Sequence, residues 1–135
     1  MAVEEPQFER GDLGKGSFKQ YRYGLAPNNA RVRMRLAGSN PAQEVLAELF
    51  GQSGLETATP RRTQAQDAAD EPIQVRLFTG ARVSAPVGWV PRGLESVVDE
   101  AFSRLDINGK KQRIPVEIIR KGGVYRVELL MGETR

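Results

Sequence analysis

A strand that must stop and a helix that follows it at once constrain the fold of this chain more than any other feature. Residues 87–105 read VGWVPRGLESVVDEAFSRL. Because proline disfavours helical geometry at the residue before it, Pro91 ends the short apolar run at Val90. The residues that follow form one apolar stripe at helical spacing: Leu94, Val97, Val98, Ala101, Phe102 and Leu105. The stretch therefore predicts a strand over 86–90 and an amphipathic helix that begins near Gly93 and ends at Asn108-Gly109.

A second helix is predicted over residues 41–50. Asn40 is a suitable N-cap, and Pro41 suits the first helical position because it lacks a backbone N–H. The apolar residues that follow keep the spacing of one helix face: Ala42, Val45, Leu46, Leu49 and Phe50. Gly51 is placed to end the helix in a left-handed conformation.

The remaining patterns indicate strands. Apolar and polar residues alternate over 18–25 and 30–36, with Pro27-Asn28-Asn29 as the turn that joins this pair, and again over 73–77. Residues 113–120 and 124–131 form a predicted hairpin around Lys121-Gly122-Gly123, and Leu55–Thr59 suits a short strand. The predicted fold class is α+β: a small antiparallel β-barrel of about six to seven strands, decorated with two short helices.

Length and composition limit the organisation of the chain. Its 135 residues suit one domain, which we place at 17–135, with a flexible loop at about 52–71. Residues 1–16 contain few apolar groups, so a disordered tail is expected. The N-terminus is acidic and polar, unlike a signal peptide, and no apolar run is long enough to span a bilayer. We therefore expect a cytoplasmic protein with no membrane contact.

Catalytic chemistry has few residues to draw on. The chain contains no Cys and no His, which removes thiolate chemistry and the commonest general base and metal ligand. Asp67, Asp70 and Glu71 lie in a loop without the fixed geometry that Mg²⁺ demands, and no nucleophile elbow, phosphate loop or dinucleotide motif is present. We expect no enzyme, no catalytic residue, no metal and no cofactor.

Charge is distributed unevenly although the net charge is only +3. No acidic residue occurs between Leu13 and Gln43, whereas both predicted helices carry acids. Strands and helices would then present opposite signs, which is a possible footprint for a polyanion; the alternative is a solvated surface of mixed charge.

From Gly38 to Glu133 the order of elements resembles the HIRAN domain. The resemblance is carried by Gly38-Ser39-Asn40 before a helix, Asp67 and Asp70 in a polar loop, the strand Ile73-Gln74-Val75, and above all Val87-Gly88-Trp89-Val90-Pro91-Arg92 before the second helix. It implies a small SH3- or OB-like barrel of the kind found in helicase-like and nuclease-associated proteins. In eukaryotic relatives this domain holds the 3′ end of single-stranded DNA, so a helicase or nuclease is an expected partner.

Cations interleaved with aromatic rings suit single-stranded nucleic acid, because cations follow the phosphates and bases stack on flat rings. The candidate binding residues are Lys19, Tyr21, Arg22, Tyr23, Arg31, Arg33, Arg35, Arg61, Arg62 and Arg92. Each has a plainer alternative. The tyrosines can pack inward, Arg61-Arg62 can be solubilising charge in a disordered segment rather than a mobile phosphate clamp, and Arg92 can pair with Glu95. Trp89 can be a stacking platform or a packed core ring.

Two hypotheses follow. The first is a non-enzymatic module that holds single-stranded DNA or one of its ends as an accessory to DNA repair or processing. The second is a protein-interaction or assembly component without nucleic-acid binding. In that case a partner or a second copy of the chain covers the hairpin, which places Ile119 and Leu130 on the face opposite Ile118.

Overall fold

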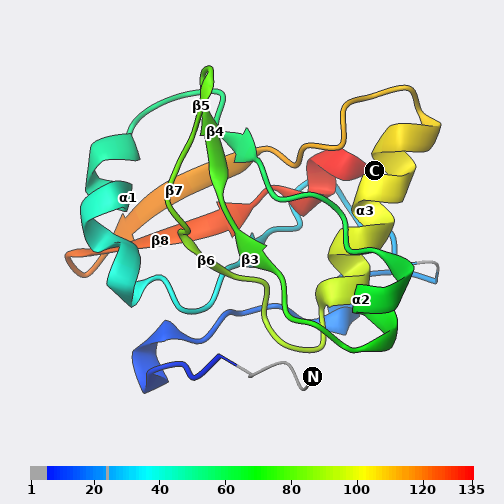
Figure 1. The fold of residues 1–135 in the computed structure, drawn as a ribbon, viewed down its shortest axis with the longest axis horizontal. Coiled ribbons are helices and arrows are strands. Elements are labelled where there is room, and N and C mark those ends of the chain that lie inside the picture. Colours follow the sequence, from blue (N-terminus) through cyan, green and yellow to red (C-terminus); the bar gives the residue numbers. More distant parts are fainter. Residues whose placement is uncertain (1–5, 24) are drawn as a thin grey trace.

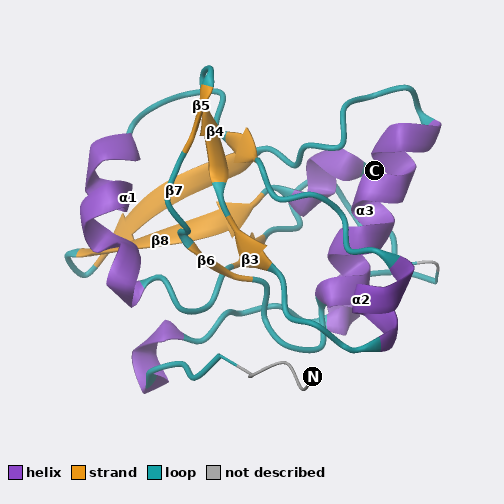
Figure 2. Cartoon of the chain, viewed as in Figure 1, coloured by secondary structure: helices purple, strands orange, loops and turns teal. Residues whose placement is uncertain are grey.

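The computed structural model describes residues 6–23 and 25–135, and it confirms a small α+β fold (Figures 1 and 2). The strands are β1 (Met34–Arg35), β2 (Glu56–Thr57), β3 (Gln74–Val75), β4 (Leu77–Thr79), β5 (Arg82–Val83), β6 (Gly88–Trp89), β7 (Val116–Lys121) and β8 (Val124–Leu129). The helices are α1 (Gln43–Leu49), α2 (Gln64–Ala68) and α3 (Glu95–Ile107). Short 3-10 turns occur at Arg10–Asp12, Phe18–Gln20, Asn40–Ala42 and Met131–Thr134.

The predicted β-barrel is wrong for the described residues. Their strands form three antiparallel sheets, in the orders β1-β8-β7, β2-β4-β5 and β3-β6, and none closes on itself. Strands β1 to β6 contain only two or three residues each, too few for the continuous, staggered hydrogen-bond ladder that closure requires. Single bridges connect the sheets instead, at Ala37–Trp89 and Glu56–Pro115.

The C-terminal hairpin is confirmed. Its two six-residue strands pair from Val116–Leu129 to Lys121–Val124. Gly122 and Gly123 both adopt left-handed backbone, with φ of 58° and 78°, which suits the two-residue turns that match strand twist. One face of the hairpin packs into the core through Val116, Ile118, Val127 and Leu129.

Helix α3 is also confirmed, with its predicted stripe buried from Leu94 to Leu105. Helix α1 forms where predicted, and Gly51 has a φ of 87°, as its role in ending the helix requires. The start of α1 differs from the expected side-chain cap. A 3-10 turn at Asn40–Ala42 leads into it, and the Gln43 side chain ties it to β8 by accepting from the Tyr125 N–H at 2.8 Å and donating to the Tyr125 carbonyl at 3.0 Å.

The structure differs from the expected tail at residues 1–16. Residues 1–5 lie outside the described part, but the following segment packs on the domain. Asp12 is buried, and its carboxylate accepts from the backbone N–H groups of Ser39 and Asn40 at 2.8 and 2.6 Å. A buried carboxylate needs such partners, and residues far along the chain provide them.

The strand predicted at 18–25 does not form in the described residues, and Gly24 lies outside them. Phe18–Gln20 is a 3-10 turn whose Ser17 hydroxyl accepts from the Lys19 N–H at 3.2 Å. Tyr21 then makes a single bridge to Pro27. The segment closes on itself, and β1 pairs with β8.

The segment at 52–71 contains more structure than the expected flexible loop. Strand β2 lies within the short strand predicted at 55–59, and Leu55 and Thr57 are buried. Helix α2, which we did not predict, begins with a capping box between Thr63 and Gln66. No helix in the described part of the chain has the length and apolar character needed to cross a bilayer.

Candidate functional site

The outer face of the β1-β8-β7 sheet is charged, but Arg33 and Arg35 at its β1 edge have carboxylate partners. Arg33 Nη1 lies 3.1 Å from a carboxylate oxygen of Glu117 and 3.1 Å from one of Glu128. Arg35 Nη2 lies 3.4 Å from the other Glu128 oxygen. The hydrogen bond to Glu128, with the charge of Glu117 nearby, raises the pKa of Arg33. The acid-free stretch at 13–43 is therefore offset by carboxylates from the C-terminal hairpin.

A basic groove lies where the N-terminal segment meets the free end of this hairpin. Its volume is about 500 Å³. Five cations line it, together with Gly11, Leu13, Gly14 and Val124: Arg10, Lys15, Arg35, Lys121 and Arg126. No carboxylate is among the residues that line it. We use the name basic groove for this set of residues.

The basic groove has a fixed wall and a free rim. In the wall, Arg126 lies 2.6 Å from Asp12 and also donates to Asn40 Oδ1 and the Gly11 carbonyl, each at 2.9 Å. Arg35 Nε is buried and has no hydrogen-bond acceptor in the part of the chain that the structure describes. At the rim, Arg10, Lys15 and Lys121 are exposed, and within the described residues they make no ion pair. An anion entering the groove would meet these three charges first.

Two other predicted cations lie together on a shallow depression. Lys19 and Arg31 line it, with a volume of about 290 Å³. Arg22 lies in the same turn, where its guanidinium donates to the Asn28 carbonyl at 2.9 Å. This depression is mildly basic and contains no aromatic ring among its lining residues.

The two predicted tyrosines differ in exposure. Tyr23 is fully exposed, so its ring is available for stacking. Tyr21 is only 8% exposed, which agrees with the inward alternative. Burial raises the pKa of Tyr21 to about 12, and the charge of Arg104 partly opposes that shift. Among the described residues, the Tyr21 hydroxyl has no hydrogen-bond partner.

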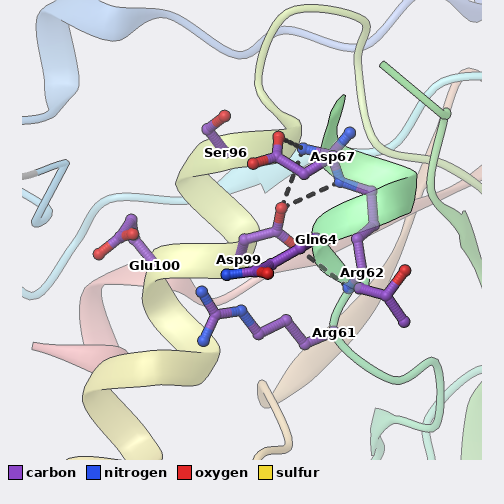
Figure 3. Close-up of a pocket in the computed structure, with 8 residues that line it drawn as sticks. Arg61, Arg62, Gln64, Asp67, Ser96, Asp99 and Glu100 are labelled. Carbon is purple, nitrogen blue, oxygen red and sulfur yellow. Dashed lines mark hydrogen bonds and ion pairs between the residues drawn. The ribbon is translucent and has the colours of Figure 1, made fainter. Parts of the chain in front are cut away.

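Arg62 lies in a buried ion pair, unlike either expectation for Arg61-Arg62. Figure 3 shows it between α2 and α3, with its side chain directed at Asp99 and Asp67. Its Nη2 is 2.9 Å from Asp99 Oδ2 and 3.1 Å from Asp67 Oδ1, and its Nη1 donates to the Glu71 carbonyl at 2.9 Å. The adjacent Arg61 is exposed. Arg62 therefore fastens the 60–71 segment to α3.

Arg92 fastens the same segment at a second point. Its guanidinium pairs with Glu95 at 2.7 Å, which confirms the alternative given above for Arg92, and with Asp70 at 3.0 Å. Asp67 and Asp70 are thus committed to arginines. No group of three or more Asp, Glu, His or Cys residues in the described part could hold a metal ion.

Trp89 is partly buried on β6, where its backbone bridges Ala37. A Cβ added at Gly38 would lie 2.8 Å from the Trp89 ring and 2.9 Å from that of Phe8, so both rings crowd this glycine. This arrangement is packing, which was one of the two alternatives for Trp89.

Four of the five cations of the basic groove were not among the candidate binding residues predicted from the sequence, although Lys15 lies in the acid-free stretch: Arg10, Lys15, Lys121 and Arg126. The available signal was the alternation of β8, which places Arg126 on the same face as Glu128 and away from buried Val127. No pattern places the N-terminal segment beside that face. Comparison of the chain with protein-family models, curated proteins and solved structures found no match.

Proposed function

We propose that this protein is a non-enzymatic nucleic-acid-binding module, similar to a HIRAN domain, that holds single-stranded DNA or its end in the basic groove. The observation that carries the proposal is a groove lined by five cations and no carboxylate, in a chain whose net charge is only +3. Concentrated positive charge attracts a polyanion more strongly than the net charge of the protein would suggest.

Phosphates would contribute most of the affinity. Exposed Arg10, Lys15 and Lys121 are free to meet them, and Arg35 lines the groove as a further cation. Four phosphate contacts on a single strand give a log–log salt slope of about −2.8, so doubling the salt concentration weakens binding about sevenfold. Tyr23, with its exposed ring, is the available platform for base stacking.

The same proposal covers the process, the partner proteins and the cell compartment in which the protein acts. A module that holds a strand without cutting it suits an accessory to DNA repair or processing, acting with a helicase or a nuclease in the cytoplasm. In this proposal, the groove and the depression at Lys19 and Arg31 bind the strand and perform no reaction on it. The resemblance at residues 87–92 supports the assignment to that class.

Charge reversal at the rim tests the proposal. Lys15→Glu combined with Lys121→Glu leaves the Arg126–Asp12 pair intact and places two negative charges in the groove. We expect at least tenfold weaker binding of a fluorescent single-stranded oligonucleotide, measured by anisotropy. Arg82→Glu is the control for a charge reversal elsewhere on the surface, because Arg82 is exposed on β5 and does not line the groove. Equal effects of both changes would contradict the proposal.

A second candidate function is an interaction module that uses the hairpin. Leu130, one of the residues expected on such a surface, lines a hollow of about 370 Å³ together with partly exposed Phe50, whereas Ile118 is already buried in the core. A partner chain or a second copy could bury these groups. Light scattering during size-exclusion chromatography checks the second copy, and a monomer at all concentrations would exclude it.

A further inference from the structure

The fold brings together two segments that lie about fifty residues apart in the sequence and that carry Arg61, Lys111 and Arg113. Residues 55–61 and 111–116 are held side by side by hydrogen bonds. The Thr57 N–H donates to the Ile114 carbonyl at 3.0 Å, and the Ile114 N–H donates to the Thr57 hydroxyl at 3.0 Å. Val116 donates to Leu55 in the same way, at 2.9 Å. Cations on both segments are therefore fixed near one another.

These segments enclose a hollow of about 450 Å³ beside the ring of Phe78, which we name the Phe78 hollow. Three cations line it: Arg61, Lys111 and Arg113. The remaining lining residues, Thr57–Pro60 and Gln112, carry no charge. A hydrogen bond of 2.8 Å from the Arg113 N–H to the Lys111 carbonyl keeps both cations on one tight turn. The hollow is positively charged and in part preorganised.

Arg113 is positioned by stacking. Its guanidinium carbon lies 4.1 Å from the centre of the Phe78 ring. Its carboxylate partner, Glu56, is 3.7 Å away, and both side chains are about one-third exposed, so that pair is weak. A guanidinium already placed over a ring loses little freedom when it donates to an anion. Within the described residues, Arg61 and Lys111 make no ion pair.

We propose that the Phe78 hollow is a second anion site, which binds the phosphate of a phosphate ester that also carries a flat ring. Three cations without a lining carboxylate match the multiple charge of a phosphate better than the single charge of a carboxylate. The stacked Arg113 and Phe78 offer planar surfaces for a base. The ligand is a nucleoside phosphate, either free or as part of a strand.

The Phe78 hollow is separate from the basic groove. Arg113 precedes β7, whereas Lys121 is its last residue, and a strand of six residues spans about 17–20 Å. Figure 1 shows the β7–β8 turn at the far end of the hairpin from the loop that enters β7. No residue lines both cavities. Each site can therefore be tested without altering the other.

Nitrogen-15 chemical-shift mapping tests this second site. We expect ATP added without divalent metal to shift the amides of residues 57–59, 61 and 111–113, since Pro60 has no N–H. Lys111→Glu, an exposed change that leaves the Arg113–Phe78 stack in place, should weaken ATP binding at least tenfold. Arg82→Glu, outside both cavities, should leave it unchanged.

The source of the phosphate is read from a parallel titration with a short oligothymidylate. Shifts at 57–61 and 111–113 with ATP alone identify a free nucleotide as the ligand, and shifts there with the oligonucleotide identify a strand. If neither ligand shifts these residues, or if Lys111→Glu has no effect on the shifts, the second site is excluded. Shifts confined to 10–15 and 121–126 exclude it while leaving the basic groove supported.

Discussion

At the scale of the residue, buried charged groups in ion pairs hold separate segments of this structure together. Arg62 and Asp99 are both buried, and so is the Asp12 partner of Arg126. Removing one member of such a pair costs more than the pair contributes, because the remaining charge is left without compensation in a medium that solvates it poorly. The surface charges beside them carry no such cost.

Arg62→Ala should therefore destabilise the protein strongly. Loss of the guanidinium leaves Asp99 buried without its partner and frees the Glu71 carbonyl, so we expect a loss of about 3–5 kcal/mol in the free energy of unfolding. Urea denaturation measures it. Arg61→Ala, one residue away and exposed, is the control and should change stability by less than about 0.5 kcal/mol. Similar losses in both variants would show that the buried pair is not what fixes this segment.

Tyr21 gives a prediction of opposite sign. Its hydroxyl is buried without a partner, so Tyr21→Phe should leave stability at neutral pH unchanged or raise it. The pKa of Tyr21 is about 12 in the folded protein and ordinarily about 10, so the unfolded chain loses this proton first. Stability from this group is complete below pH 10 and is lost as the pH rises toward 12. Ultraviolet titration should show a tyrosine ionising near pH 12 that is missing in the variant; normal ionisation of every tyrosine would contradict the account.

Elements with strong, uninterrupted patterns were predicted well. The stripe from Leu94 to Leu105 specified α3, and alternation around Gly122-Gly123 specified the β7–β8 hairpin. The strand predicted from the alternation at 18–25 was wrong. The Ser17 side chain and the nearby turn satisfy the backbone hydrogen bonds locally, so Phe18–Gln20 forms a 3-10 turn instead of pairing as a strand. Local hydrogen bonds of this kind compete with sheet formation and leave no trace in the apolar pattern.

Helix α3 provides the test at this scale. Phe102 is 1% exposed, and Phe102→Ala should lower the free energy of unfolding by about 3–5 kcal/mol through lost burial and the cavity left behind. Ile107 on the same helix is 82% exposed, so Ile107→Ala is the matched control with little expected effect. Thermal unfolding followed by circular dichroism compares them. A large loss in the control alone would mean that α3 buries the opposite face.

At the scale of the whole molecule, acidic and basic groups are distributed differently from what we expected from the sequence. We expected acidic helices opposite a basic sheet, but Glu95 and Asp99 of α3 are paired with Arg92 and Arg62. The outer face of the sheet is also largely neutralised by Glu117 and Glu128. Among the described residues, cations without carboxylate partners lie in the basic groove and the Phe78 hollow, where segments distant in the sequence come together. Composition alone does not predict the tertiary contacts that bring these segments together. Of the predicted site, Arg35 alone lines the basic groove.

The salt dependence of oligonucleotide binding tests the central claim most directly. Affinity for a fluorescent single-stranded oligonucleotide would be measured at two salt concentrations, for the unaltered protein and for the Lys15→Glu, Lys121→Glu variant. We predict about sevenfold weaker binding by the unaltered protein when salt is doubled, and a clearly shallower dependence in the variant. Binding that is absent, or that does not respond to salt, would contradict a basic groove that holds a phosphate backbone.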